Sequence, residues 1–205
     1  MSPTDLRFSG VSRRFGHLAV LAGVSGEVSA GQALLVTGAN GSGKSTLLRC
    51  LAGLLAPDSG EIECREEGRS LDAAERRRRV GMVAPDIAFY EELTVAENLA
   101  FFARLRRARP ERPAELLERV GLPGDRMAGA LSSGMRQRLR WVWALLHRPR
   151  LLLLDEPFQN LDRPGETVTR ELLEEHLAAG EGLAVIANPS SLEVSRVAAR
   201  LELGG

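Results

Sequence analysis

The fold of this chain is decided by one stretch, Gly38-Ala39-Asn40-Gly41-Ser42-Gly43-Lys44-Ser45-Thr46. It follows the apolar run Ala33 to Thr37 and leads into an apolar helical segment, which is the context that a phosphate-binding loop requires. Glycines let backbone N–H groups point inward at phosphate oxygens, and the start of the helix adds the positive end of its dipole. We therefore predict a nucleotide phosphate site, with the Ser45 hydroxyl as a Mg²⁺ ligand and Thr46 bonding an α- or β-phosphate.

Lys44 is the only lysine of the chain, because the other residues among its 27 lysines and arginines are all arginine. The ammonium group is a compact point charge on a slim stem, whereas a guanidinium fork is too broad to enter a glycine-rich loop. We predict that Lys44 reaches the phosphate oxygens and is a catalytic residue. The alternative is that one lysine has survived by chance in an arginine-rich composition.

Two adjacent carboxylates end a second apolar run, in the order Leu151-Leu152-Leu153-Leu154-Asp155-Glu156-Pro157. Carboxylates at the end of a buried strand are costly unless a cation lies beside them. We predict that Asp155 holds the Mg²⁺, directly or through water, and that Glu156 polarises the attacking water as general base. The alternative is that both acids simply end a strand at the surface.

Short apolar runs indicate a buried, mainly parallel sheet, in which ligands collect at the carboxyl ends of the strands. The runs are Ala33 to Thr37, Val80 to Ala84, Leu151 to Leu154 and Leu183 to Ala187, with Glu61 to Cys64 as a weaker strand candidate.

The middle of the chain predicts helices instead. Thr94 and Glu97 form a capping box, Pro113 suits the first turn of a second helix, and Ser132 or Ser133 can cap a third. We therefore expect an α/β core of residues 1–84 and 141–205, with a helical subdomain of residues 85–140 inserted into it.

Composition narrows the class of protein. The 44% of hydrophobic residues is ordinary for a globular protein. The formal net charge is zero, so electrostatics do not favour nucleic acid as a partner. No apolar run approaches the roughly 20 residues of a membrane span, and residues 1–10 lack a signal-peptide core. Cys50 and Cys64 have no metal-ligand spacing, so we expect a reduced, cytoplasmic protein.

At this point the chain resembles the ATP-binding subunit of ABC transporters over essentially its whole length. The resemblance rests on the order of the two phosphate-site motifs above, on a signature-like Leu131-Ser132-Ser133-Gly134-Met135, on the D-loop-like Asn160-Leu161-Asp162 and on Thr94 to Leu99. It implies a P-loop NTPase core with a small antiparallel β part. It also implies that Phe15 stacks on the adenine of ATP.

The resemblance implies partners too. A second ATPase cassette, identical or homologous, would bring its own Ser132, Ser133 and Gly134 over the ATP held by this chain. A transmembrane permease would be energised by the closing of the two cassettes. The expected place is the cytoplasmic face of the inner membrane, with ATP and Mg²⁺ as the bound groups.

Several positions depart from the family pattern. Ser133 and Met135 replace a glycine and a glutamine of the signature, and Ala84-Pro85-Asp86 lacks the glutamine that the family has after this strand. Asp86 could bind metal instead. The strand ending at Ala187 leads to Asn188 where the family has a histidine; Asn188 could still donate a neutral hydrogen bond. We therefore expect slow hydrolysis, since a lost transition-state donor costs roughly 10²–10³ in turnover.

Alternatives remain open. One is a nucleotide-gated module with little turnover, and another is a soluble family member acting on DNA or ribosomes. The short length and Glu156-Pro157-Phe158 are similar to haem-export ATPases. Arg76 to Arg79 is expected to be a solvated face, or a contact for anionic lipid. Phe89 and Tyr90 are either core anchors or part of a groove for a membrane partner. His17, His147 and His176 are expected at the surface.

Overall fold

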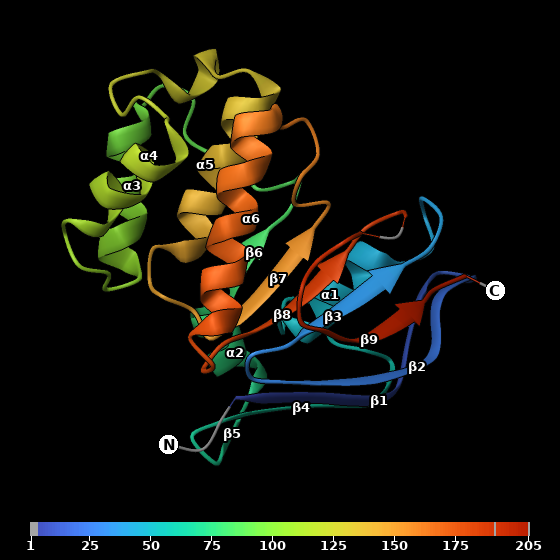
Figure 1. Cartoon of the computed structure of the whole chain (residues 1–205). Coiled ribbons are helices and arrows are strands. Elements are labelled where there is room, and N and C mark those ends of the chain that lie inside the picture. The colour runs from blue at the N-terminus through green and yellow to red at the C-terminus, as the bar shows by residue number, and fades with distance from the viewer. Residues whose placement is uncertain (1–3, 191, 205) are drawn as a thin grey trace.

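The computed structural model describes residues 4–190 and 192–204. Its centre is a parallel sheet in the order β6-β7-β8-β3-β9, which confirms the predicted mainly parallel core (Figure 1). Its strands are β3 (Ala33–Thr37), β6 (Gly81–Val83), β7 (Leu151–Asp155), β8 (Leu183–Ala187) and β9 (Val197–Glu202). Burial on both faces explains why the first four read as continuous apolar runs.

A second, antiparallel sheet in the order β2-β1-β4-β5 confirms the expected small antiparallel part. It contains β1 (Asp5–Phe15), β2 (Leu18–Ser29), β4 (Ser59–Glu66) and β5 (Arg69–Leu71). The weaker strand candidate, Glu61 to Cys64, lies inside β4. Figure 1 shows this sheet along one side of the molecule, away from the helices α3 to α6.

Helix α1 (Lys44–Leu51) lies between the two sheets and carries the end of the phosphate loop. One apolar cluster joins Leu47 and Leu48 of α1 to Leu6 and Phe8 of the antiparallel sheet and to Val36 of β3. Because side chains alternate along a strand, Leu35 of β3 belongs to a second cluster on the other face of the parallel sheet. The phosphate loop is therefore fixed to the core at both of its ends.

The helices pack against that other face (Figure 1). They are α3 (Val95–Leu105), α4 (Arg112–Val120), the 3₁₀ turn η1 (Ala128–Ala130), α5 (Ser133–Leu145) and α6 (Arg163–Ala178). The predicted capping box is present at α3, where the Thr94 hydroxyl accepts from the Glu97 N–H (3.2 Å) and the Glu97 carboxylate accepts from the Thr94 N–H (2.8 Å). At α5 the cap is Ser132, and Ser133 is the first helical residue.

Two expectations about charged and ionisable side chains hold only in part. The basic run lies on α2 (Ala73–Arg79), and Arg77 to Arg79 are exposed, as expected of a solvated face. Arg76 is buried instead, and its guanidinium donates to the carbonyl oxygens of Ile62 (3.4 Å) and Leu71 (3.2 Å). His147 and His176 are half-buried, and only His17 is exposed as expected. Each of these two imidazoles has a backbone carbonyl as a hydrogen-bond partner, that of Arg79 for His147 (3.1 Å) and that of Leu183 for His176 (3.2 Å).

Candidate active site

The phosphate loop connects β3 to α1, as the sequence predicts. The Lys44 side chain, 5% exposed, folds back over the loop so that Nζ donates to the carbonyl oxygens of Gly38 (2.7 Å) and Ala39 (2.9 Å). The ammonium group is thus held against the first residues of the loop by two carbonyls. Its donors are of the kind that bind phosphate oxygens.

The close packing around Gly38 explains why the loop needs glycine there. Gly38 has φ 144°, and a Cβ on it would lie 2.3 Å from the carbonyl oxygen of Leu203 and 2.7 Å from Ser42 Oγ. The Ser42 hydroxyl is itself buried without a hydrogen-bond partner among the described residues. Because orphaned buried hydroxyls are rare, this atom fits a site that a phosphate oxygen completes.

Ser45 and Asp155 meet at the expected metal position. Asp155 is 5% exposed at the end of β7 and lies beside the Ser45 side chain. Burial raises the pKa of Asp155, and the Ser45 hydroxyl and the Lys44 ammonium oppose that rise. Paired hydroxyl and carboxylate oxygens suit Mg²⁺, which also keeps waters and substrate phosphates as ligands. Among the described residues, no group of three or more His, Cys, Asp or Glu side chains could hold a metal ion.

Asp86, the alternative metal ligand, is engaged elsewhere. Its carboxylate forms an ion pair with Arg49 of α1, with Arg49 Nη2 2.8 Å from Asp86 Oδ2. Both side chains are partly exposed to solvent. The carboxylate still contributes to raising the pKa of Asp155, so it lies within electrostatic reach of the metal position.

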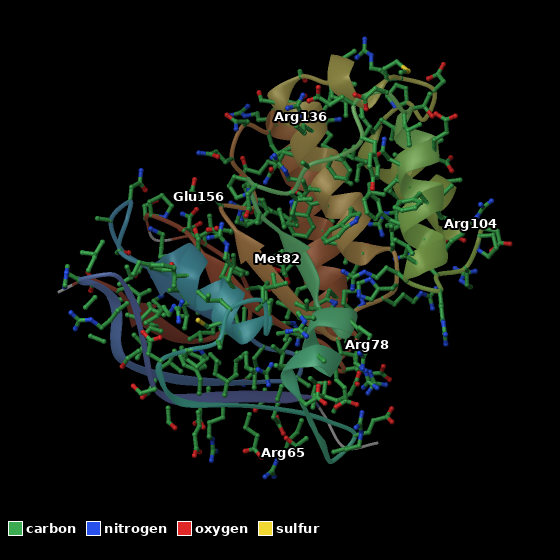
Figure 2. The ribbon with its side chains drawn as sticks, turned by 180° about the vertical axis from the view of Figure 1, so that it is seen from behind. Arg65, Arg78, Met82, Arg104, Arg136 and Glu156 are labelled. Atoms are coloured by element: carbon green, nitrogen blue, oxygen red, sulfur yellow. The ribbon has the colours of Figure 1, made fainter. Side chains whose placement is uncertain are left out.

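Glu156 occupies a strained position directly after β7. Its φ is 47°, in the left-handed region that costs a non-glycine residue on the order of 1–3 kcal/mol. The Glu156 N–H donates to the Ala187 carbonyl of β8 (2.9 Å), and the Gln137 amide donates to the Glu156 carbonyl (3.2 Å). Figure 2 shows Glu156 on the side of the molecule where α1 and the helices meet. Hydrogen bonds on both sides thus restrain the backbone that carries the half-buried Glu156 side chain.

Asn188 lies at the same edge of the sheet, one residue beyond Ala187, which pairs with Asp155. Its backbone N–H donates to the Val36 carbonyl (3.0 Å), and its side-chain Nδ2 donates to the Ser190 carbonyl (2.9 Å). The structure therefore brings the residue to the site, with its amide bonded to its own loop. Donation to a phosphate requires the Asn188 side chain to leave Ser190.

Phe15 is 49% exposed at the end of β1, and the Arg13 guanidinium lies 5.1 Å from the centre of its ring. Phe15 pairs with Leu18 in the hairpin, and the carbonyl oxygen of Val20 lies 2.7 Å from where a Cβ on Gly43 would stand. The hairpin thus reaches the phosphate loop and offers an exposed aromatic ring near it.

The signature stretch stands on the helical part, away from the chain's own phosphate loop (Figure 1). Ser132 and Ser133 are exposed, and Ser132 Oγ accepts from the Met135 N–H (3.3 Å) at the start of α5. Gly134 packs on the D-loop, because a Cβ there would lie 2.7 Å from the Asn160 carbonyl oxygen. Met135 contacts Arg126, whose Nη1 lies 3.1 Å from the Met135 sulfur.

The aromatic pair after β6 divides between two environments. Phe89 packs edge-on against Phe102 of α3 and belongs to the core of the helical part. Tyr90 is 50% exposed and contacts Phe101, which is also exposed. A pocket of about 140 Å³ beside them is lined by residues including Pro85, Asp86, Phe89 and Arg140. Phe89 is therefore the core anchor, and Tyr90 is available at the surface.

Sequence reasoning missed the polar residues on the inner side of α5. Gln137 donates to the Glu156 carbonyl, Arg140 donates to carbonyls of the loop after β6, and Trp141 Nε1 donates to the Pro157 carbonyl (2.9 Å). The sequence feature that could have revealed them is a glutamine one turn before a tryptophan on an otherwise apolar helix face. Their partners lie 16–55 positions away in the chain, so the sequence gives no indication of which groups they bond.

A phosphate loop between a strand and a helix, with Ser45 and the buried carboxylate of Asp155 beside it, defines a P-loop nucleotide-binding protein. The family model described as ABC transporter matches residues 21–159. The chain belongs to the ABC transporter family, and it is one of the ATP-binding subunits that energise a membrane permease. No helix within residues 4–190 and 192–204 combines the length and apolar character needed to cross a membrane.

Two curated relatives are similar in sequence to most of this chain. A phosphonates import ATP-binding protein, PhnC, from Bordetella parapertussis is 39% identical over 217 residues, covering 94% of this chain and 84% of that protein. A Fe(3+) ions import ATP-binding protein, FbpC, from Streptomyces coelicolor is 43% identical over 169 residues, covering 80% of this chain and 48% of that protein.

Solved structures share the fold. One described as the ATP binding subunit of an ABC transporter has a TM-score of 0.78 and 28% identity, covering 89% of this chain and 79% of that chain. A Pyrococcus furiosus protein described as a candidate ABC transporter ATP-binding protein has a TM-score of 0.80 and covers 97% of both chains; at 23% identity it bears on the fold alone.

Proposed function

We propose that the chain hydrolyses MgATP at the site built by Lys44, Ser45, Asp155 and Glu156. The observation that carries this proposal is the convergence of the Lys44 ammonium, the Ser45 hydroxyl and the buried Asp155 carboxylate at the ends of β3 and β7. Bound Mg²⁺, held by Ser45 and Asp155, would neutralise negative charge on the phosphate oxygens. These residues fit a triphosphate better than any other ligand class, because they pair one cation with a metal position.

Each residue has a distinct role in the proposal. Lys44 binds the terminal phosphates, and the backbone N–H groups of Gly41 to Thr46 orient them. Glu156 accepts a proton from the attacking water, and its fixed backbone holds the carboxylate in line. Phe15 supplies the ring on which adenine stacks. Asn188 donates a neutral hydrogen bond in place of a histidine, which makes hydrolysis slow.

We further propose that two cassettes close around ATP. Ser132, Ser133 and Gly134 of one subunit would contact the nucleotide of the other, since α5, which begins at these residues, lies apart from the phosphate loop between β3 and α1 (Figure 1). Binding would thus favour the closed dimer, and hydrolysis would release it. The second cassette would be an identical or homologous chain that carries the same signature residues.

Coupling to a separate permease would place the protein on the cytoplasmic face of the inner membrane. Two relatives are named import ATP-binding proteins, and this supports uptake over haem export. The exposed rings of Tyr90 and Phe101, with the pocket of about 140 Å³ that Phe89 helps to line, support a docking groove beside α3.

The decisive test combines two variants with light scattering in millimolar MgATP. Glu156→Gln is expected to accumulate as an ATP-bound dimer, because its amide keeps the shape of the site but cannot accept the proton. Lys44→Ala is expected to stay monomeric under the same conditions. A Glu156→Gln protein that remains monomeric with its permease present contradicts the closing mechanism.

The second candidate function is a nucleotide-gated module without useful turnover. The bond between Asn188 and Ser190 favours it, because this amide points to its own loop and not to a phosphate. Phosphate release separates the two functions. Turnover equal to that of Lys44→Ala supports the gate, whereas turnover well above it supports the ATPase.

A further inference from the structure

A buried amide on α5 holds the backbone of the proposed catalytic carboxylate. Gln137 is 4% exposed, and its Nε2 donates to the carbonyl oxygens of Glu156 (3.2 Å) and Pro157 (2.9 Å). Both acceptors belong to the strained turn that follows β7. Since the Glu156 N–H is bonded to Ala187, the peptide groups before and after the Glu156 side chain are both restrained. Any displacement of Gln137 is therefore passed to this carboxylate.

Arg140, one turn further along α5, connects that amide to a distant loop. Its Nη1 donates to Gln137 Oε1 (3.0 Å), its Nη2 to the Pro85 carbonyl (2.6 Å) and its Nε to the Ile87 carbonyl (3.3 Å). A guanidinium group is a rigid planar fork, so these three bonds move as one unit. The half-buried guanidinium thereby joins the loop after β6 to the turn after β7.

The same loop is also tied to the phosphate side of the site. Asp86, between the two carbonyls that Arg140 binds, pairs with Arg49 of α1 (2.8 Å). The loop borders the pocket of about 140 Å³ that contains Phe89 and Arg140. It is also the place where the chain has Ala84-Pro85-Asp86 and no glutamine. The loop is thus connected to α1 through the Asp86–Arg49 ion pair and to the Glu156 backbone through Arg140 and Gln137.

We propose that Arg140 and Gln137 act as a relay that couples the position of the loop after β6 to the position of the Glu156 carboxylate. Both are positioning residues, because their side chains bond to each other and to backbone carbonyls of the loop after β6 and the turn after β7. The inference rests on the proposed ATPase function and extends it with a route by which this chain transmits loop movement without a glutamine. A ligand or partner that lifts the loop shifts Arg140, then Gln137, then the turn that carries Glu156.

The first test is steady-state ATP hydrolysis by the full chain. Arg140→Ala removes all three bonds and is expected to lower kcat by about 10- to 100-fold, the range for a misplaced catalytic group, with KM for ATP nearly unchanged. Arg140→Lys retains the charge and some donors, so it is expected to recover part of kcat. Gln137→Glu keeps the acceptor for Arg140 but loses the donors to Glu156 and Pro157, so its kcat is expected to fall similarly.

The double variant separates a relay from two independent effects. In a relay, Arg140→Ala combined with Gln137→Glu loses no more kcat than the worse single variant, because either change already breaks the chain of bonds. Independent contributions multiply instead. Arg104→Ala is the matched control, because Arg104 is exposed on α3, has no hydrogen-bond partner among the described side chains and lies far from Glu156 in Figure 2.

A spectroscopic readout tests the relay without turnover. Trp141 Nε1 donates to the Pro157 carbonyl, so its emission reports on the same turn. In a Trp143→Phe background, Trp141 is the single tryptophan of the chain. Arg140→Ala is expected to shift the Trp141 emission and to speed amide exchange at Glu156, whereas Arg104→Ala is expected to change neither.

Different measurements test the ATPase function and the relay. A wild-type chain with no hydrolysis above Lys44→Ala contradicts the ATPase function, and the relay is then judged by Trp141 emission and amide exchange alone. If wild type hydrolyses ATP and Arg140→Ala retains kcat within about twofold, the relay is wrong. It is equally wrong if the emission of Trp141 is the same in Arg140→Ala as in its background, or if the kcat losses multiply.

Discussion

The Cα atom of Gly134 in the signature stretch lies so close to the D-loop that a Cβ there would stand 2.7 Å from the carbonyl oxygen of Asn160. The D-loop continues to Asp162, which pairs with Arg138 of α5 and caps α6 by accepting from the Gly165 N–H (3.0 Å). The contact joins two segments that the family resemblance assigns to the nucleotide interface. They therefore move together within one subunit.

This contact predicts that Gly134→Ala forces the D-loop outward. Overpacking of this kind costs about 1–3 kcal/mol of stability. The free energy of unfolding in urea measures it. Gly124→Ala is the control, because a Cβ at Gly124 would meet only ordinary contacts, 3.4 Å from side-chain atoms of Ala96 and Leu117. Equal stability of both variants would contradict the close approach.

The capping box of α3 gives a second prediction. Thr94→Ala removes the hydroxyl that accepts from the Glu97 N–H and also donates to its carboxylate (2.8 Å), so it should destabilise the protein by about 1 kcal/mol. Thr167→Ala serves as the matched control, because Thr167 is exposed within α6 and its hydroxyl donates to the Arg163 carbonyl of the same helix (3.0 Å), so it does not cap a helix N-terminus. A thermal midpoint for Thr94→Ala as high as that of Thr167→Ala would show that α3 does not depend on its cap.

The environment of His147 leads us to predict that the free energy of unfolding depends on pH. Burial, with a contribution from Arg106, lowers the pKa of His147 from its ordinary value of 6.5 to about 4. The unfolded chain therefore binds a proton at a higher pH than the folded chain does. Stability from neutral His147 is complete above pH 6.5 and is lost as pH falls toward 4, amounting to about 1 kcal/mol between pH 7.5 and 5.5.

Urea unfolding at pH 7.5 and 5.5 measures this change. His147→Gln should flatten the slope, because glutamine can still donate to the Arg79 carbonyl but does not titrate. Some slope should remain, since burial also lowers the pKa of His176. His17→Gln, at an exposed position, should keep the full slope. An unchanged slope in His147→Gln would show that the buried imidazole is not the source.

We predict that Asn188→His increases the rate of ATP hydrolysis. Replacing Asn188 by histidine restores the donor that the resemblance leads us to expect, and a lost transition-state donor costs roughly 10²–10³ in turnover. Because the Asn188 amide can supply part of this donation, Asn188→His should raise kcat by about tenfold or more. Asn188→Ala should lower it. Equal rates for all three proteins would show that this position does not touch the reacting phosphate.

The sequence predicted the parts of the fold whose signal is local. β3 and β8 have the predicted bounds, since a strand buried on both faces is a continuous apolar run, and Thr94 marks the start of α3 by its side chain. β1 and β2 were not located, because register shifts between Phe8 and Val11 break the alternation of side chains. Their inner faces become recognisable only once α1 packs on them.

Within the candidate site, too, only the local features could be predicted from the sequence. The positions of the phosphate loop and of Asp155 could be predicted, because each belongs to a motif of fixed spacing that follows an apolar run. The bonds from Arg140 to Gln137 and to the Pro85 carbonyl could not, because the second partner is 55 positions away and the helix face gives no indication of it. Long-range polar contacts depend on how α5 packs, which no local pattern encodes.

Isothermal calorimetry with MgATP and the full chain measures whether the phosphate loop binds a nucleotide. Wild type should give a saturable heat, and Lys44→Ala, folded to the same thermal midpoint, should give none. The reason is that Lys44 Nζ, now bonded to the carbonyls of Gly38 and Ala39, is the one side-chain cation that the phosphate loop presents to a triphosphate. Absence of heat from well-folded wild type, or equal binding by Lys44→Ala, would contradict the account.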